Sequence, residues 1–178
     1  METKEATRRP AIFFDRDGTL NVDTGYLYRA EDFRWIEDAP AAIRWANDHG
    51  YLAVVITNQS GVARGLYKEA DVEKLHRWMN DRLAAMGAHI DAFYYCPHHP
   101  EGTVARYRKA CDCRKPGTAL VEEACRALHI DKNGSFLIGD ADRDMACAER
   151  AGLRGLKYEG GSLLKALLRG VGCDEYGR

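Results

Sequence analysis

Short runs of mostly apolar residues recur along the chain, and segments with helical periodicity lie between and after them. The run at residues 11–14 contains no polar residue. A run without a polar face predicts a strand that is buried on both sides, as the strands of a parallel sheet are. Strands are predicted over residues 11–14, 51–56, 90–95, 135–139 and 153–158.

The longest helical pattern covers residues 69–86, where Val72, Leu75 and Met79 recur at the spacing of one helix face. Asp38 is expected to act as the N-cap of an earlier helix that ends before Gly50. The segment 20–37 has no clear period and predicts a loop or irregular hairpin beside the functional site. Helices are predicted over residues 38–50, 69–86, 118–128, a segment that ends near Gly152, and 163–168.

Strand and helix alternate throughout, which predicts right-handed crossovers onto a parallel sheet with helices on both faces. The expected fold is therefore an α/β three-layer sandwich. At 178 residues the chain has the length of one domain. We expect a flexible leader over residues 1–10, a single domain over 11–170 and a flexible tail over 171–178.

Composition and charge narrow the possible partners. Apolar residues make up 46% of the chain and charged residues 30%, with a net charge of −1. This balance does not favour a nucleic-acid or membrane partner. The charged N-terminal segment does not resemble a signal peptide, and no apolar run is long enough to span a bilayer. A cytoplasmic protein is expected.

Polar groups capable of phosphoryl chemistry follow three of the predicted strands. Because the carboxyl ends of parallel strands share one edge of the sheet, these groups are expected to meet there. Carboxylates bind Mg²⁺, and a lysine and a hydroxyl can hold phosphoryl oxygens. The alternative is a set of ordinary turns rich in Asp and Gly. The groups are Asp15 and Asp17, Thr57, Asp140 and Asp144, with Lys115 from the segment before the third helix.

Three of the six cysteines lie with two histidines in a second pattern, Cys96-Pro97-His98-His99 followed by Cys111-Asp112-Cys113. Three thiols and one imidazole make a closed tetrahedral set for structural Zn²⁺. The alternative is a group of free or oxidised thiols. The spacing leaves open whether His98 or His99 is the ligand. Cys125, Cys147 and Cys173 are scattered and are expected to be buried or incidental.

The groups at the strand ends resemble the four motifs of the haloacid dehalogenase-like phosphatases: Asp15-x-Asp17-Gly18-Thr19, Thr57, Lys115 and Gly139-Asp140-x-x-x-Asp144. The resemblance implies that Asp15 is the nucleophile and that Asp17 is the general acid and then the base. It implies that Asp15, the main-chain carbonyl of Asp17, and Asp140 hold Mg²⁺. Thr57 and Lys115 would bind the transferred phosphoryl group. It also implies the Rossmann-like fold of that family, here without a separate cap domain.

The Cys/His insert and the segments 57–65 and 111–116 resemble a narrower group, the heptose 1,7-bisphosphate 7-phosphatases and histidinol-phosphate phosphatases. By this resemblance His98 is preferred as the zinc ligand. Two departures stand out: Gly117 follows Lys115-Pro116 directly, and Ala141 occupies a position where the heptose enzymes commonly carry a lysine. The resemblance implies substrate contacts from Asp23, Thr24, Gly25, Tyr26, Asn58, Gln59, Ser60 and Arg114.

Together these observations predict a monomeric, Mg²⁺-dependent phosphatase with a structural Zn²⁺. The substrate predicted by resemblance is a small phosphorylated sugar, D-glycero-D-manno-heptose 1,7-bisphosphate, on the route to nucleotide-activated heptose. Three alternatives are a histidinol-phosphate phosphatase, a nucleic-acid 3′-phosphatase, and a non-catalytic phospho-accepting or zinc-organised interaction module. The acid and base offered by Asp17 argue against the last, and the lack of a basic stripe argues against nucleic acid.

Overall fold

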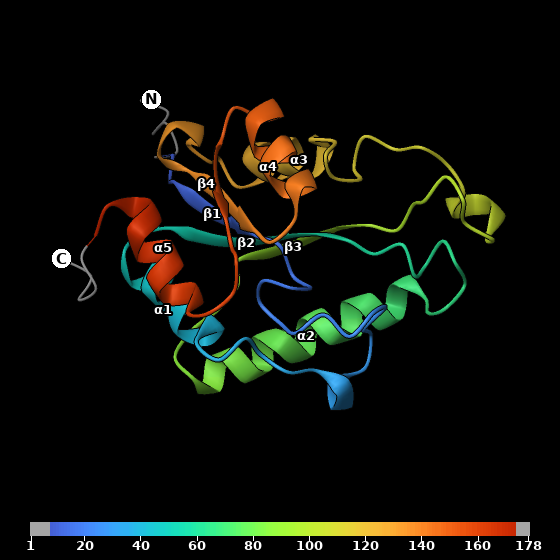
Figure 1. Cartoon of the computed structure of the whole chain (residues 1–178), viewed down its shortest axis with the longest axis horizontal. Coiled ribbons are helices and arrows are strands. Elements are labelled where there is room, and N and C mark those ends of the chain that lie inside the picture. Colours follow the sequence, from blue (N-terminus) through green and yellow to red (C-terminus); the bar gives the residue numbers. More distant parts are fainter. Residues whose placement is uncertain (1–7, 174–178) are drawn as a thin grey trace, which may run out of the picture.

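A five-stranded parallel sheet forms the centre of the protein (Figure 1). The computed structural model describes residues 8–173. The strands lie in the order β3-β2-β1-β4-β5, so β1 is the central strand. The strands are β1 (Ala11–Phe14), β2 (Leu52–Asn58), β3 (Ala92–Cys96), β4 (Phe136–Gly139) and β5 (Arg154–Lys157).

Helices cover both faces of this sheet, which gives the predicted three-layer sandwich. α1, α2 and α5 pack on one face, and α3 and α4 pack on the other (Figure 1). Three short 3-10 turns lie in the connecting segments. The helices are α1 (Ala39–Asp48), α2 (Glu69–Ala85), α3 (Ala119–Ala127), α4 (Asp142–Arg150) and α5 (Leu163–Val171).

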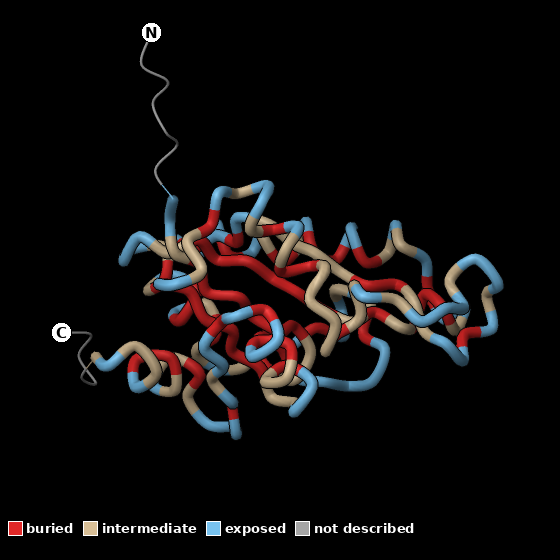
Figure 2. The backbone as a smooth tube through the Cα atoms, turned by 90° about the horizontal axis from the view of Figure 1, so that it is seen from above, coloured by how far each residue is buried: buried red, intermediate tan, exposed pale blue. Residues whose placement is uncertain are grey.

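The central strand explains why the core has two halves. All four residues of β1 are fully buried, and successive side chains of a strand point to opposite faces. Ile12 and Phe14 pack with the core of α1, α2 and α5, whereas Ala11 and Phe13 pack with α3 and α4. Buried residues accordingly run through the middle of the molecule, between more exposed connections (Figure 2).

The predicted strands and helices are confirmed, with boundaries that differ by a few residues. The most useful difference is in β2, which continues to Asn58 because Thr57 and Asn58 pair with Tyr95 and Cys96 of β3. The segment 20–37 is irregular, as predicted. It is held by isolated bridges from Asn21 to Asp17 and Trp35 and contains one short 3-10 turn.

Asp38 precedes α1, as predicted, but its side chain does not cap that helix. Instead it accepts hydrogen bonds at the start of α5, from the main-chain nitrogens of Leu163 (2.8 Å) and Leu164 (3.2 Å) and from the Ser162 hydroxyl. Asp38 therefore occupies the predicted N-cap position of α1, but its carboxylate caps the start of α5 instead, a contact that its sequence position does not reveal. This contact fastens α1 to α5.

The predicted leader and tail lie largely outside the described residues. Of the leader, Arg9 pairs with the segment 129–131, and the Pro10 carbonyl accepts from the Leu52 main chain at 2.9 Å. At the other end, α5 continues to Val171. No helix within residues 8–173 is long and apolar enough to cross a bilayer.

Replacing Asp38 by Ala is expected to lower the free energy of unfolding by about 1–2 kcal/mol, because the N-terminal amides of α5 lose their acceptor. Asp48→Ala is the matched control, since Asp48 is an exposed partner of Arg44 on α1. Urea unfolding measures the difference, and hydrogen exchange should show faster opening at the start of α5. Equal stability of the two variants would contradict this role.

Candidate active site and zinc centre

A buried lysine lies between two carboxylates at the carboxyl edge of the sheet. Lys115 Nζ is 2.7 Å from Asp15 Oδ1 and 2.7 Å from Asp144 Oδ1. Asp15 follows β1, Asp144 lies in the first turn of α4, and Lys115 comes from the loop before α3. All three side chains are at most 5% exposed. The structure therefore brings Lys115 to Asp15, which lies 100 positions earlier in the chain.

Burial and the neighbouring charges together shift the pKa values of Asp15 and Lys115. Removal from water raises the pKa of Asp15 to about 7; nearby Lys115 opposes this shift and Asp144 adds to it. Burial also works against the charged form of Lys115, but the carboxylates of Asp15 and Asp144 outweigh it and raise the pKa of that amine. Asp15 is thus a carboxyl group that needs a further positive charge to be fully ionised near neutral pH.

The carboxylates here fit a divalent cation. Oxygens of Asp15, Asp140 and Asp144 all lie within 4.8 Å of one another. Asp15 Oδ2 is buried and has no hydrogen-bond partner, and such an orphaned oxygen calls for a ligand. Asp144 is already engaged by Lys115 and by the main-chain nitrogen of Ala141 (3.0 Å). Asp15 and Asp140 are therefore the side chains best placed to hold Mg²⁺.

Gly18 keeps this corner open. A Cβ at Gly18 would lie 2.4 Å from Asp140 Oδ2, and the residue has a φ of +88°. Both features exclude a side chain. Thr19, the next residue, donates from its hydroxyl to Asp140 Oδ1 at 3.3 Å. The Gly-Thr pair after Asp17 thus aligns the loop after β1 with the loop after β4.

A cavity of about 320 Å³ opens over these groups. It brings most of the predicted substrate contacts to one place. Thr24 and Arg114 are not among its lining residues; Arg114 lies beside the cysteine cluster. The lining residues are Asp15, Asp17, Asp23, Gly25, Tyr26, Thr57, Asn58, Gln59, Ser60, Tyr67 and Arg143.

The tip of β2 is fastened to the lysine-bearing loop. Asn58 Oδ1 accepts from the Lys115 main-chain nitrogen at 2.9 Å, and Asn58 Nδ2 donates to the Lys115 carbonyl at 3.1 Å. The side-chain amide of Asn58 is therefore occupied by main-chain groups. This reciprocal pair places Lys115 below the cavity, where its amine can reach Asp15.

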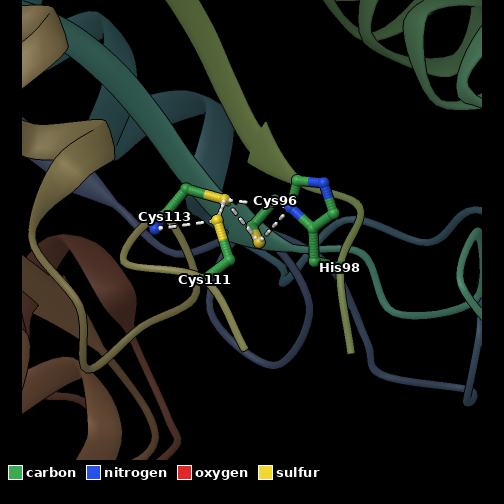
Figure 3. A group of neighbouring side chains, drawn as sticks. All are labelled: Cys96, His98, Cys111 and Cys113. Carbon is green, nitrogen blue, oxygen red and sulfur yellow. Dashed lines mark hydrogen bonds between the residues drawn. The ribbon is translucent and has the colours of Figure 1, made fainter. Parts of the chain in front are cut away.

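The predicted zinc ligands form one cluster (Figure 3). Cys113 Sγ lies 2.7 Å from Cys96 Sγ, 2.8 Å from Cys111 Sγ and 3.4 Å from His98 Nδ1. All four ligand atoms lie within 4.8 Å of one another. Three sulfurs and one nitrogen at this separation fit the donor set of a structural Zn²⁺.

The thiols of the cluster shift one another's pKa in opposite directions. Hydrogen bonds from Cys113 and His98 lower the pKa of Cys96 to about 6, whereas the hydrogen bonds with Cys96 and Cys111 raise the pKa of Cys113. The thiolate is the form that binds zinc. His99 faces away from the cluster, with Nε2 3.4 Å from Arg64 Nη2. The structure therefore brings His98 to the cluster. Cys125, Cys147 and Cys173 lie outside it; Cys147 is buried and the other two are partly exposed.

Sequence comparison identifies close relatives of known activity. The chain is 48% identical over 158 residues to the D-glycero-β-D-manno-heptose-1,7-bisphosphate 7-phosphatase of Rhodopseudomonas palustris, covering 89% of this chain and 88% of that one. It is 46% identical over 142 residues to the protein of the same name from Escherichia coli K12, covering 80% and 74%. A family model for HAD-like hydrolases matches residues 112–173.

A solved structure agrees with this result. The crystal structure of D,D-heptose 1,7-bisphosphate phosphatase from B. bronchiseptica, complexed with magnesium and phosphate, superposes with a TM-score of 0.75. It is 32% identical to this chain, and the match covers 95% of this chain and 90% of that one. The chain belongs to the haloacid dehalogenase-like phosphatases. Within them it joins the heptose bisphosphate phosphatase group, as the motifs and the Cys/His insert predict.

Membership of the haloacid dehalogenase-like phosphatases makes this protein a hydrolase of phosphate esters, and the rival interpretation as a non-catalytic module is set aside. Sequence reasoning did not select several residues that the structure places in or beside the site. Arg16 was detectable, because it is a charge between two motif aspartates next to a buried strand. Arg143 has the same signal, since it lies between Asp140 and Asp144, and Arg64 lies within the segment 57–65 that carries the resemblance. Tyr67 has no such signal, since only the fold brings it to the cavity.

Protein purified without chelators is expected to contain about one zinc per chain, and Cys111→Ser is expected to lose it. Loss of the metal should lower the free energy of unfolding by about 3 kcal/mol or more, since binding stabilises only the folded chain. Cys125→Ser is the control, because Cys125 lies outside the cluster. Elemental analysis and thermal unfolding measure both effects. Zinc-free protein of unchanged stability would contradict the zinc assignment.

Proposed function

We propose that this protein removes the 7-phosphate of D-glycero-D-manno-heptose 1,7-bisphosphate. The names of the relatives at 46–48% identity support the substrate, and the arrangement of Asp15, Asp17, Lys115 and Asp140 supports the chemistry. The reaction would serve the synthesis of nucleotide-activated heptose. Magnesium is the proposed catalytic ion, which the related structure with magnesium and phosphate supports.

The proposed chemistry has two displacements at phosphorus. Asp15 forms a bond to phosphorus while the bond to the sugar oxygen breaks, and Asp17 gives its proton to that oxygen. Water then attacks the aspartyl-phosphate, Asp17 takes a proton from it, and inorganic phosphate leaves. Mg²⁺ held by Asp15, Asp140 and the Asp17 carbonyl would neutralise charge on the phosphoryl group. Lys115 orients Asp15, and Thr57 donates to a phosphoryl oxygen.

Three arginines beside the cavity support the proposal that the substrate has two phosphates. Arg64, Arg114 and Arg143 have no carboxylate partner among the described residues. Arg114 Nη1 and Arg64 Nε are buried without a hydrogen-bond partner. Burial lowers the pKa of Arg114, and nearby Arg143 and Arg64 lower it further. Such a group favours a dianion, because paired N–H donors match phosphate oxygens.

A substrate with two phosphates would occupy both the aspartate site and the arginine group. Asp15 would attack the reacting phosphate, and Arg114 would bind the distal phosphate. Arg64 and Arg143 would add positive charge there. Arg143 would supply a positive charge near the position where the heptose enzymes commonly carry lysine and this chain carries Ala141. Histidinol phosphate has a single phosphate and would leave the arginines without a partner.

The remaining assignments follow from the same residues. We propose that Zn²⁺ bound by Cys96, His98, Cys111 and Cys113 stabilises the loop that carries Arg114 and Lys115. The cysteines of the described residues form no disulfide, which suits the reducing cytoplasm, and we propose that the protein resides there. We propose a monomer.

Arg114→Ala is expected to lower kcat/KM for heptose 1,7-bisphosphate by roughly 10- to 150-fold, mainly through KM, because a charge-assisted contact to the distal phosphate is lost. The same variant should change kcat/KM for heptose 7-phosphate by less than about threefold. Arg126→Ala on α3 is the control, since Arg126 lies away from the cavity. Steady-state kinetics on a phosphomonoester panel measures these values.

Two results would contradict the substrate proposal. One is a kcat/KM of the unaltered protein on histidinol phosphate that equals or exceeds the value on heptose 1,7-bisphosphate. The other is an equal loss by Arg114→Ala on the bisphosphate and the monophosphate, which would mean that Arg114 does not read the second phosphate.

A further inference from the structure

The carboxylate of Asp17 is surrounded by hydrogen-bond donors. Arg16 Nη2 lies 3.1 Å from each of its oxygens, and Asn21 Nδ2 donates to Oδ1 at 3.0 Å. Arg16 is itself fully buried and is held by the Leu27 carbonyl (2.8 Å) and by His76 Nε2 (3.2 Å). These contacts fix one side of Asp17 to the core of the protein.

Gln59 holds the other side. Its Nε2 donates to Asp17 Oδ2 at 3.0 Å and to Thr57 Oγ1 at 2.8 Å. Its Oε1 accepts from the Tyr67 hydroxyl at 2.7 Å. Gln59 is only 2% exposed, and both of its amide hydrogens are used within the protein. Its side chain is thus committed to neighbouring residues and has no free donor for a substrate.

Tyr67 decides which way this amide points. The Tyr67 hydroxyl donates to Oε1, the acceptor end of the amide, and this turns the NH₂ end of Gln59 toward Asp17 and Thr57. The Tyr67 ring is held in turn. It stacks on Tyr28 with centroids 5.1 Å apart, and it packs so closely on Gly61 that a Cβ there would lie 2.2 Å from Tyr67 Cε1.

We propose that Gln59 is a positioning residue for Asp17 and Thr57, with Tyr67 fixing the orientation of its amide. The inference rests on the proposed function, because it takes Asp17 as the acid that protonates the leaving sugar oxygen. One amide then sets two catalytic groups. Since Thr57 Oγ1 accepts from Gln59, the Thr57 hydroxyl hydrogen is free to donate to the phosphoryl group. Sequence resemblance assigned Gln59 to direct substrate contact instead.

A leaving-group comparison tests this role, because kcat/KM reports the steps up to release of the alcohol. An alkyl alcohol needs the proton of Asp17 to leave, whereas p-nitrophenolate leaves without it. Gln59→Met keeps the side-chain length and removes the amide. It is expected to lower kcat/KM for heptose 1,7-bisphosphate by roughly 10- to 100-fold more than for p-nitrophenyl phosphate, because misplacement of Thr57 affects both substrates and misplacement of Asp17 affects only the alkyl leaving group.

Tyr67→Phe removes only the hydroxyl that holds the Gln59 amide. It is expected to lower the ratio of kcat/KM for heptose 1,7-bisphosphate to kcat/KM for p-nitrophenyl phosphate, by a smaller factor than Gln59→Met does. Added to Gln59→Met, it should change the ratio no further, because it acts through Gln59. Tyr28→Phe is the control; its hydroxyl contacts Arg29 at 3.1 Å and does not touch Gln59. Tyr67→Phe also keeps the inference testable if Gln59→Met does not fold.

Two outcomes are separable. The positioning role would be overturned if Gln59→Met lowered kcat/KM equally for the alkyl and the aryl substrate. If Gln59→Met does not fold, an unchanged ratio of the two values in Tyr67→Phe would overturn it. Either result would leave the proposed function standing. Failure of the unaltered protein to hydrolyse heptose 1,7-bisphosphate would overturn the proposed function itself, and with it the role given to Gln59.

Discussion

The ion pairs of Lys115 are the interaction on which the site depends. A buried ammonium between two buried carboxylates is stable only if the partners are held at short distance, since each unpaired charge would carry a large desolvation cost. Asp15, Asp144 and Lys115 meet this condition at 2.7 Å. They come from β1, α4 and the loop before α3, so the ion pairs exist only when the central strands and this loop are assembled.

The rest of the fold serves this geometry. β1 and β4 are neighbours in the sheet, which puts Asp15 and Asp140 at one edge. The cysteine cluster ends two residues before Lys115, and Asn58 binds the Lys115 main chain. The lysine is therefore held both by the proposed zinc-bound loop and by the tip of β2. The clustered carboxylates of Asp15, Asp140 and Asp144 carry more charge than the one ammonium of Lys115 balances, and a divalent cation is the natural complement.

Sequence reasoning recovered the sheet, the helices and the motif residues because each has a local signal. Apolar runs without a polar face identify buried strands such as β1, and Cys96, His98, Cys111 and Cys113 carry ligand spacing. It did not recover contacts that depend on the tertiary fold. Asp38 caps a helix 124 residues away, and Tyr67 reaches the cavity through packing that no local pattern encodes. Gln59 was recognised by its motif, but only the hydrogen bonds suggest what its amide does.

The most direct test of this account is the pH dependence of Mg²⁺ binding, measured by calorimetry on the unaltered protein and Asp15→Asn. Because burial raises the pKa of Asp15 to about 7, Mg²⁺ must displace a proton below that pH. The affinity should fall about tenfold per pH unit below 7 and level off above it. Asp15→Asn should bind more weakly and lack this dependence. Binding that is independent of pH in the unaltered protein, or unaffected by Asp15→Asn, would contradict the account.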